Sequence, residues 1–275
     1  MLKRRARFLA PLVLAPALGA GSLLVLGGGA SAAPGAVANH APARAVITSG
    51  SALAVHGAPA PTAVAPLAAP GLDPRVLALA EEAASRARAR GLADHPRTLS
   101  VIDYSLPSTE KRLWVFDLET RELLFHELVA HGMNTGANRA TRFSNADESK
   151  QTSLGLFVAN ETYVGRNGYS LRLDGLDAGI NDNARRRAIV VHGADYVSAD
   201  FARRQGRIGR SWGCPALPVA VHRQIIDTMK GGNLLFAYYP DSALLERSEF
   251  LRDTAPASDV LASLAATGAG AVAAR

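Results

Sequence analysis

The chain has 275 residues, a formal net charge of +6 and one cysteine, so a scaffold held together by internal disulfides is excluded. Four of its cations lie within the first seven residues, a stretch that contains no acid. Without them the net charge falls to about +2, which does not favour nucleic acid as a partner, and no nucleic-acid-binding motif is present.

Residues 1–32 have the pattern of a signal peptide. The cations are followed by an apolar run over 8–26 and by Ala30-Ser31-Ala32, which fits a small-residue cleavage site. The apolar run approaches the length of a membrane span, so a retained anchor is the alternative. Glycines at 27–29 interrupt the run and favour cleavage. We therefore expect an exported protein that is not stably inserted in a membrane after cleavage.

Composition divides the rest of the chain into three parts. Residues 33–72 are mostly Ala, Pro, Gly and Val, and we expect them to form a tether. Residues 73–252 have the length of one ordinary domain. Residues 253–275 are again rich in alanine, and we expect them to form a tail.

The domain is expected to begin with a helix and to continue with strands. Asp73 and Pro74 fit an N-cap and a first-turn proline, and Gly91 fits a C-terminal stop. Short β-branched or aromatic runs predict strands over 99–103, 112–116, 123–130, 154–158, 170–173, 188–191 and 233–239. Apolar residues at helical spacing predict a helix over 218–230. This pattern predicts a β-rich α+β fold with a few helices.

The single cysteine, Cys214, is the first candidate for chemistry. Exported proteins normally pair their cysteines, so a lone thiol is either packed as a small apolar residue or kept for its reactivity. Gly213 permits a close backbone approach. The helix expected over 218–230 begins four residues later, and a helix N-terminus favours a thiolate. These features favour a nucleophile over a buried structural cysteine.

His192 is the candidate base. It follows the apolar run 188–191, which we expect to be a strand buried on both faces, and a strand end is a rigid support for an imidazole. The alternative is a histidine that only satisfies a backbone carbonyl. His126 and His131 lie five residues apart along another expected strand, so they face opposite ways and make a poor metal pair. We expect no metal site.

Two segments together resemble a known catalytic region. They read Ala-Ile-Val-Val-His-Gly-Ala-Asp-Tyr-Val over 188–197 and Gly-Arg-Ile-Gly-Arg-Ser-Trp-Gly-Cys-Pro-Ala-Leu over 206–217. They are similar to the murein L,D-transpeptidases, and more narrowly to the branch of the YkuD-type superfamily in which Ser-x-Gly-Cys-Pro follows a Val-His-Gly strand. The resemblance extends over residues 100–240 and leaves the tether and the tail unmatched.

The resemblance implies a β-sandwich or barrel that attacks the bond between a diamino acid and the following D-alanine in a peptidoglycan stem peptide. It implies Cys214 as nucleophile, His192 as base, and the backbone N–H groups of Ser211, Trp212 and Gly213 as oxyanion donors. The acyl-enzyme would pass to an amine or, in an L,D-carboxypeptidase, to water. No cofactor is implied, and the location would be the periplasm or cell wall. From a different class, the alternative is a non-catalytic wall-binding module, which needs neither the histidine nor the cysteine.

The chain departs from the broader superfamily beside the cysteine. Trp212 stands where a histidine is usual, and Pro215-Ala216 stands where arginine or asparagine often follows. We expect these changes to affect acceptor recognition rather than the nucleophile or the base. Trp212 either lines the substrate groove or simply packs.

Arginines between the two candidate residues are possible substrate contacts. Stem peptides carry carboxylates, which the guanidinium group recognises well. Arg207 and Arg210 are therefore candidate substrate-binding residues. Gly193, which follows His192, is a third candidate. A run of charges usually marks a solvated face, which is our interpretation of the arginines at 185–187.

A second motif matches a different enzyme class. Ser108-Thr-Glu-Lys111 fits the Ser-x-x-Lys of penicillin-binding proteins. That chemistry also needs a Ser-Asp-Asn element, which the chain lacks, and places its serine at the start of a helix. Ser108 follows Pro107 between two expected strands, so we interpret this motif as a turn.

Overall fold

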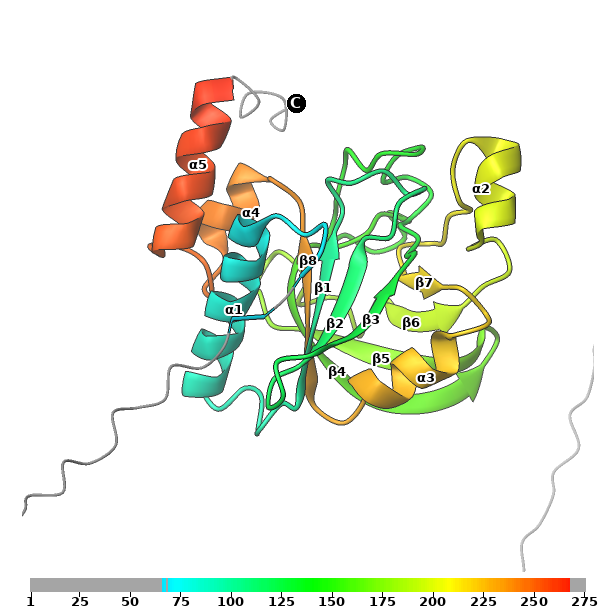
Figure 1. Ribbon diagram of the computed structural model, residues 1–275, viewed down its shortest axis with the longest axis horizontal. Coiled ribbons are helices and arrows are strands. Elements are labelled where there is room, and N and C mark those ends of the chain that lie inside the picture. Colours follow the sequence, from blue (N-terminus) through cyan, green and yellow to red (C-terminus); the bar gives the residue numbers. More distant parts are fainter. Residues whose placement is uncertain (1–65, 68, 268–275) are drawn as a thin grey trace, which may run out of the picture. The chain divides into compact units, whose positions relative to one another are not determined.

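The computed structural model describes residues 66–67 and 69–267. The expected signal peptide, residues 33–65 of the expected tether and residues 268–275 lie outside the described residues. Figure 1 shows a curved sheet with helices on two sides. On one side lie α1 (Pro74–Ala89), α4 (Ser242–Arg247) and α5 (Ala255–Thr267), and on the other lie α2 (Ala199–Gln205) and α3 (His222–Met229).

Eight strands form one sheet in the order β3-β2-β1-β8-β4-β5-β6-β7. Neighbouring strands are antiparallel, except that β1 runs parallel to β8 and β6 runs parallel to β7. The strands are β1 (Thr98–Asp103), β2 (Leu113–Asp117), β3 (Leu123–Glu127), β4 (Gly155–Gly165), β5 (Gly168–Gly175), β6 (Val190–Gly193), β7 (Ala216–Leu217) and β8 (Asn233–Tyr238).

The sheet curls until its two ends meet. After β3, the N–H of Ala130 donates to the carbonyl of Ala216 in β7 at 2.8 Å, in an antiparallel bridge. Burial of one large apolar side chain stabilises a fold by about 1.5–3 kcal/mol. Several large aromatic side chains are fully buried, among them Trp114, Phe116, Phe157 and Phe236. The result is a nearly closed β-barrel with a few helices, and the expected fold class is confirmed.

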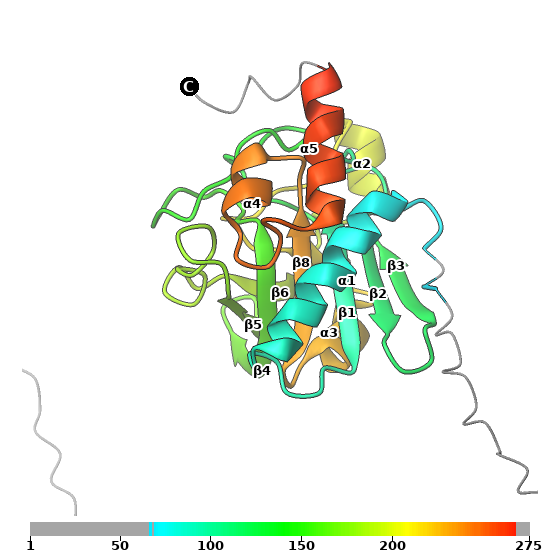
Figure 2. The same cartoon turned by 90° about the vertical axis from the view of Figure 1, so that its left-hand side faces the viewer.

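Helix α1 confirms the first expected element. The Asp73 carboxylate accepts the N–H of Arg75 at 2.8 Å, and Pro74 occupies the first turn. The helix lies against the sheet and against α5, as Figure 2 shows, and its apolar stripe is buried. The buried members of that stripe are Val76, Leu79, Ala80, Ala83, Ala84 and Ala87. No helix within the described ranges has both the length and the hydropathy needed to cross a membrane.

Two expected boundaries near the candidate site differ in the structure. The strand expected over 188–191 begins only at Val190, because Ala188 has a φ of 54°, a left-handed conformation that does not fit a strand. His192 therefore lies inside β6 rather than after it. The helix expected over 218–230 begins at His222, because β7 and a turn occupy the residues after Cys214. The expectation that a helix begins four residues after the thiol is wrong.

Residues from the expected tether and tail contribute to the same core. Leu67 and Leu72 are buried, and the carbonyl of Pro70 accepts a hydrogen bond from Trp114 Nε1 at 3.0 Å. Helix α5, which comes from the expected tail, buries Ala257 and Val260.

The side chain of Asn181 joins the start of β4 to the turns that lead into β6. Its Nδ2 donates to the carbonyls of Leu154 and Leu156 at 2.9 and 3.0 Å. Its Oδ1 accepts the N–H of Asp177 at 2.8 Å. The residue is fully buried, so no water can replace these partners.

We expect Asn181→Ala to lower the free energy of unfolding by about 3 kcal/mol, because it leaves buried carbonyl and N–H groups without partners. Chemical denaturation monitored by circular dichroism measures this change. Asn167→Ala is the control: Asn167 is exposed in the turn between β4 and β5, and its loss should cost no more than about 0.5 kcal/mol. Equal stabilities of the two variants would contradict this role for Asn181.

Candidate active site

Cys214 lies just before β7, in a turn that faces the segment leading into β6. Its side chain is 9% exposed, and Sγ donates to the carbonyl of Ala188 at 3.7 Å. The left-handed backbone of Ala188 turns this carbonyl toward the thiol. Burial raises the pKa of the Cys214 thiol, against the lowering effects of the Val190 N–H and of the Arg187 charge. The thiol is therefore neutral at neutral pH.

His192 lies in the strand next to that turn. The backbone N–H of His192 donates to the carbonyl of Pro215 at 3.4 Å, and His192 pairs in register with Ala216. Its Nδ1 lies 2.9 Å from the carbonyl of Gly193. A carbonyl only accepts, so Nδ1 carries the proton and Nε2 has a free lone pair. Burial lowers the pKa of His192, so the imidazole is also neutral at neutral pH.

The structure brings these two predicted residues onto adjacent paired segments. The backbone of His192 lies beside the two residues that follow Cys214. The thiol donates to Ala188 rather than to the imidazole. The two side chains thus come from hydrogen-bonded neighbouring segments, with both groups neutral and each bonded to a different carbonyl.

The hydroxyl of Ser211 closes the cysteine turn. Its Oγ donates to the carbonyl of Cys214 at 2.6 Å and accepts the N–H of Gly213 at 3.1 Å. The N–H of Ser211 itself donates to the carbonyl of His131 at 3.0 Å. Of the three N–H groups expected to bind an oxyanion, those of Ser211 and Gly213 are thus already occupied. Among the described residues, the N–H groups of Trp212 and Cys214 have no acceptor.

Gly213 is required by the packing behind this turn. Its φ is 122°, and a Cβ at this position would lie 2.8 Å from the carbonyl oxygen of Gln151. The neighbouring Thr152 joins the same contact, since its Oγ1 accepts the N–H of Gly132 at 2.9 Å and donates to the carbonyl of Gly213 at 3.3 Å. The sequence contained Thr152 within the matched region, but only the fold shows that it supports the turn.

The buried guanidinium of Arg112 supports the cysteine turn through His131, whose carbonyl accepts the N–H of Ser211. Arg112 is fully buried, and its Nη2 lies 2.8 Å from Nδ1 of His131. Its other donors reach the carbonyls of Leu106 and Val129, at 2.8 to 3.1 Å. Burial lowers the pKa of Arg112 to about 10. Burial, and then the Arg112 charge, lower the pKa of His131 to about 4, so His131 is neutral.

One arginine of the triplet at 185–187 is not on the surface, contrary to our expectation. Arg185 pairs with Asp174, and Arg186 lies 3.2 Å from Asp147, and both arginines are exposed. Arg187 is half-buried near the thiol, and its guanidinium donates only to carbonyl and hydroxyl oxygens. These acceptors are the carbonyls of Ser144 and Gln151 and the hydroxyls of Ser149 and Ser153. Three equal residues in a row gave no sequence signal for this difference.

One family model matches most of the described domain. The family model described as the L,D-transpeptidase catalytic domain matches residues 68–238, more than half of the chain. The chain belongs to the L,D-transpeptidase catalytic domain family. This family acts on peptidoglycan peptides. No curated protein matches the chain.

Solved structures of L,D-transpeptidases are similar to this chain at low identity. One from Mycobacterium smegmatis is 15% identical, with a TM-score of 0.33, over 52% of this chain and 59% of that one. One from Stackebrandtia nassauensis is 14% identical, with a TM-score of 0.33, over 61% of this chain and 67% of that one. The match thus spans 59% of the length of the mycobacterial protein.

Within this L,D-transpeptidase domain, the remaining candidate residues have local roles. Arg210 Nη1 donates to the carbonyls of Met133 and Gly136 at 3.0 and 2.8 Å. Arg207 Nη1 donates to the carbonyl of the next residue, Ile208, at 2.9 Å. Both arginines are thus engaged with backbone oxygens.

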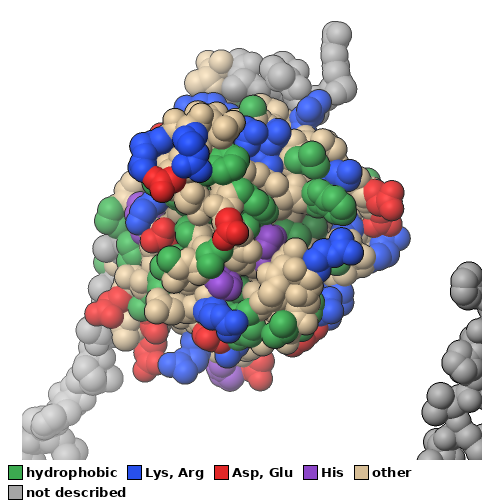
Figure 3. All heavy atoms as spheres, turned by 90° about the vertical axis from the view of Figure 1, so that its right-hand side faces the viewer, with side chains coloured by type: hydrophobic (Ala, Val, Ile, Leu, Met, Phe, Trp, Pro, Cys, Tyr) green, Lys and Arg blue, Asp and Glu red, His purple; other side chains and the backbone are tan. Residues whose placement is uncertain are grey.

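Gly193 packs against the first residue of α3. A Cβ on Gly193 would lie 2.7 Å from the ring of His222. The sequence predicts that His222 lies in a helix, but nothing in it indicates that the ring of His222 lies beside the strand that carries His192. Figure 3 shows the face of the molecule with α2, α3 and β7, where histidine side chains reach the surface near the middle.

The Ser-x-x-Lys motif is a turn, as expected. Ser108 Oγ donates to Asn138 Oδ1 at 2.9 Å and accepts the N–H of Ile208 at 3.3 Å. Lys111 Nζ instead lies 3.2 Å from Glu127 Oε1. The serine and the lysine thus have different partners, and nothing couples them.

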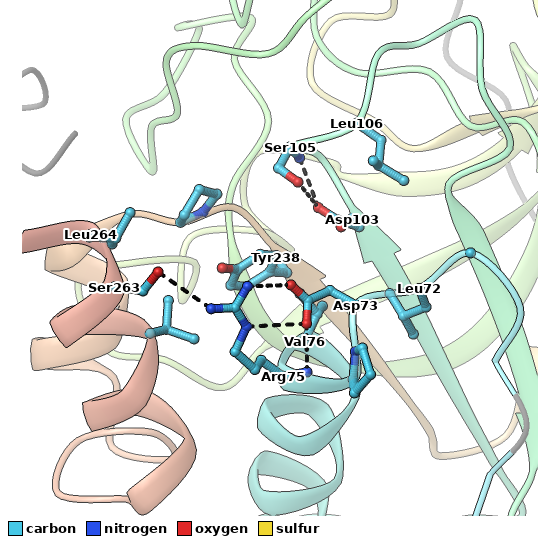
Figure 4. A pocket seen from close by; sticks show the side chains of 14 residues that line it. Leu72, Asp73, Arg75, Val76, Asp103, Ser105, Leu106, Tyr238, Ser263 and Leu264 are labelled. Atoms are coloured by element: carbon cyan, nitrogen blue, oxygen red, sulfur yellow. Dashed lines mark hydrogen bonds and ion pairs between the residues drawn. The ribbon is translucent and has the colours of Figure 1, made fainter. Parts of the chain in front are cut away.

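A pocket of about 700 Å³ lies away from the candidate pair. It opens between α1, α5 and the ends of β1 and β8 (Figure 4). Arg75 and Asp73 pair in it at 2.9 Å, and the guanidinium also reaches Ser263 at 3.4 Å. Neither Cys214 nor His192 lines this pocket.

We expect acid to destabilise the domain through His131. Its pKa is about 4 in the folded protein against an ordinary value of 6.5, so between these pH values the unfolded chain binds a proton that the folded one does not. The resulting stability is complete above pH 6.5 and falls by up to about 3 kcal/mol as the pH drops to 4. Denaturant unfolding at several pH values measures it.

His131→Gln should remove this part of the pH dependence, because glutamine does not titrate. The matched control is His95→Gln, since His95 is almost fully exposed. An unchanged slope in His131→Gln would show that other groups cause the loss of stability in acid.

Proposed function

We propose that this domain is a cysteine-dependent L,D-transpeptidase that acts on peptidoglycan stem peptides through an acyl-enzyme at Cys214. The observation that carries the proposal is the placement of the only cysteine. It lies in a turn that is hydrogen-bonded to the strand carrying His192, and among the described residues the N–H groups of Trp212 and Cys214 have no acceptor. Membership of the family supports the same reaction.

The first half of the reaction forms a thioester. The thiol leaves the carbonyl of Ala188, gives its proton to Nε2 of His192, and its sulfur bonds to the carbonyl carbon of the stem peptide. The N–H groups of Trp212 and Cys214 stabilise the oxyanion. The C–N bond then breaks, and the departing D-amino acid takes the proton from His192.

The neutrality of both groups defines the role of His192. Burial raises the pKa of the Cys214 thiol and lowers the pKa of the imidazole, so a preformed thiolate–imidazolium pair is disfavoured. His192 therefore acts as a general base at the moment of attack. The hydrogen bond from Nδ1 to the carbonyl of Gly193 orients the ring and stabilises the imidazolium that forms.

The second half of the reaction releases the acyl group. An amine of a neighbouring stem attacks the thioester carbon, its proton passes to His192, and the C–S bond breaks. His192 then returns the proton to the thiolate. Attack by the amine gives a crosslink, whereas attack by water gives a trimmed stem, the L,D-carboxypeptidase reaction.

We expect Cys214→Ala to abolish product formation, by about 10³-fold or more, because no other thiol is present. His192→Ala should lower the rate about 10²- to 10⁴-fold through loss of the general base. The measurement is incubation of purified protein with a disaccharide-tetrapeptide, followed by chromatography of the muropeptides.

Dimers in this assay report crosslinking and tripeptides report trimming. His95→Ala is the control, because it removes an exposed histidine far along the chain from the candidate pair. Product formed by Cys214→Ala at the wild-type rate would refute the nucleophile, and a wild-type rate in His192→Ala would refute the base.

We also propose that the protein is exported to the periplasm or cell wall, because residues 1–32 have a signal-peptide pattern. The protein recovered from outside the cytoplasmic membrane should begin at Ala33, after the small-residue site. N-terminal sequencing checks this. Retention of residues 1–32 would instead support a membrane anchor.

A further inference from the structure

A second pocket lies beside the turn that carries Cys214, because Trp212 of this turn lines it. It has a volume of about 670 Å³ and is lined by Asp147, Glu148, Lys150, Arg186, Arg187 and Trp212. Trp212 precedes Cys214 by two residues, and Arg187 precedes Ala188, whose carbonyl accepts the thiol. The lining of this pocket and the surroundings of the thiol thus come from the same two segments of the chain.

The wall of this pocket is an exposed aromatic ring. Trp212 is 68% exposed, although large apolar side chains are normally buried. The ammonium of Lys150 lies 5.0 Å from the centre of the indole ring. A cation held over an aromatic face keeps its remaining N–H donors available to a ligand.

Positive charge in this pocket exceeds negative charge at the described residues. Arg186 neutralises Asp147, at 3.2 Å, whereas Lys150 makes no ion pair with any described carboxylate. Arg187 also meets only neutral oxygens. Three cations thus face two carboxylates, Asp147 and Glu148. The unpaired excess favours an anionic ligand.

The backbone fixes Lys150 in place. Its φ is 55°, a conformation that costs free energy in any residue other than glycine. Its carbonyl lies so close to Gly132 that a Cβ there would be 2.4 Å away. The same carbonyl accepts the N–H of Asn134 at 3.2 Å. The ammonium therefore projects from a rigid support rather than from a free surface loop.

We propose that this pocket is a carboxylate-binding subsite for the peptide substrate, with Lys150 as the group that contacts the anion and Trp212 as its apolar wall. This proposal rests on the proposed function, because the ligand is the acidic peptide that reaches Cys214. Arg187 contributes its positive charge to the pocket but no hydrogen bond to the ligand, because its donors already bind the carbonyls and hydroxyls of the loop. The ligand class is a peptide with a free carboxylate near the bond that the thiol attacks.

Binding to the inactive Cys214→Ala protein tests this subsite without turnover. The probes are a stem tetrapeptide with free carboxylates and the same peptide with its carboxylates converted to carboxamides. Isothermal titration calorimetry gives both dissociation constants. Lys150→Gln should weaken binding of the free-carboxylate peptide about tenfold, as expected for one charge-assisted hydrogen bond, and change the carboxamide peptide by less than about twofold.

Two further variants separate charge at this site from charge in general. Lys150→Arg should retain the preference for the free carboxylate, because it keeps the cation. Lys111→Gln removes one cation elsewhere, from a lysine that pairs with Glu127, and should change neither affinity. The proposal is overturned if Lys150→Gln leaves the free-carboxylate affinity unchanged or weakens both peptides equally, and also if neither peptide binds.

The outcome also distinguishes this subsite from the proposed chemistry. If the free-carboxylate peptide binds with the expected dependence on Lys150 but the protein with Cys214 intact forms neither dimers nor tripeptides, the reaction is wrong and the subsite stands. If products form but Lys150→Gln leaves the dissociation constant of the free-carboxylate peptide unchanged, the proposed reaction stands and the proposed subsite is wrong.

Discussion

The buried guanidinium of Arg112 is the interaction on which the candidate site depends. A charge in a protein interior is costly unless its donors are satisfied, and at this position the acceptors are carbonyls and an imidazole rather than a carboxylate. These bonds fix His131, whose own carbonyl holds the N–H of Ser211. The hydroxyl of Ser211 then closes the turn at Cys214. A continuous chain of hydrogen bonds thus joins the buried Arg112 side chain to the turn that carries the thiol.

The same burial that supports the turn sets the chemistry of the pair. A buried thiol and a buried imidazole both resist charge, so the resting site holds a neutral pair. The tautomer of His192 is fixed by the hydrogen bond from its Nδ1 to the carbonyl of Gly193, so no carboxylate is needed for this purpose. In the proposed reaction, two backbone N–H groups and the nearby Arg187 would stabilise the charge that appears during attack.

Local patterns in the sequence predicted the elements whose causes are local. Asp73 and Pro74 specified the start of α1, and alternating or apolar runs located most of the strands. The late start of α3 depends on pairing of Ala216 with β6, which is a long-range contact that periodicity does not contain. The three adjacent arginines at 185–187 look alike in the sequence, yet only the fold decides that Arg187 turns inward. The roles of Ser211 and Thr152 likewise depend on groups far away in the chain.

The pocket beside Trp212 and the turn that carries Cys214 have a common neighbour, the loop before β4. The loop that carries Lys150 contacts the cysteine turn directly, since Gly213 meets the carbonyl of Gln151 and Thr152 bonds to Gly213. Gly213 has no Cβ, so the two backbones approach each other directly at this position. The proposed carboxylate subsite and the cysteine turn therefore share one support, because Lys150 directly precedes Gln151 and Thr152 in the chain.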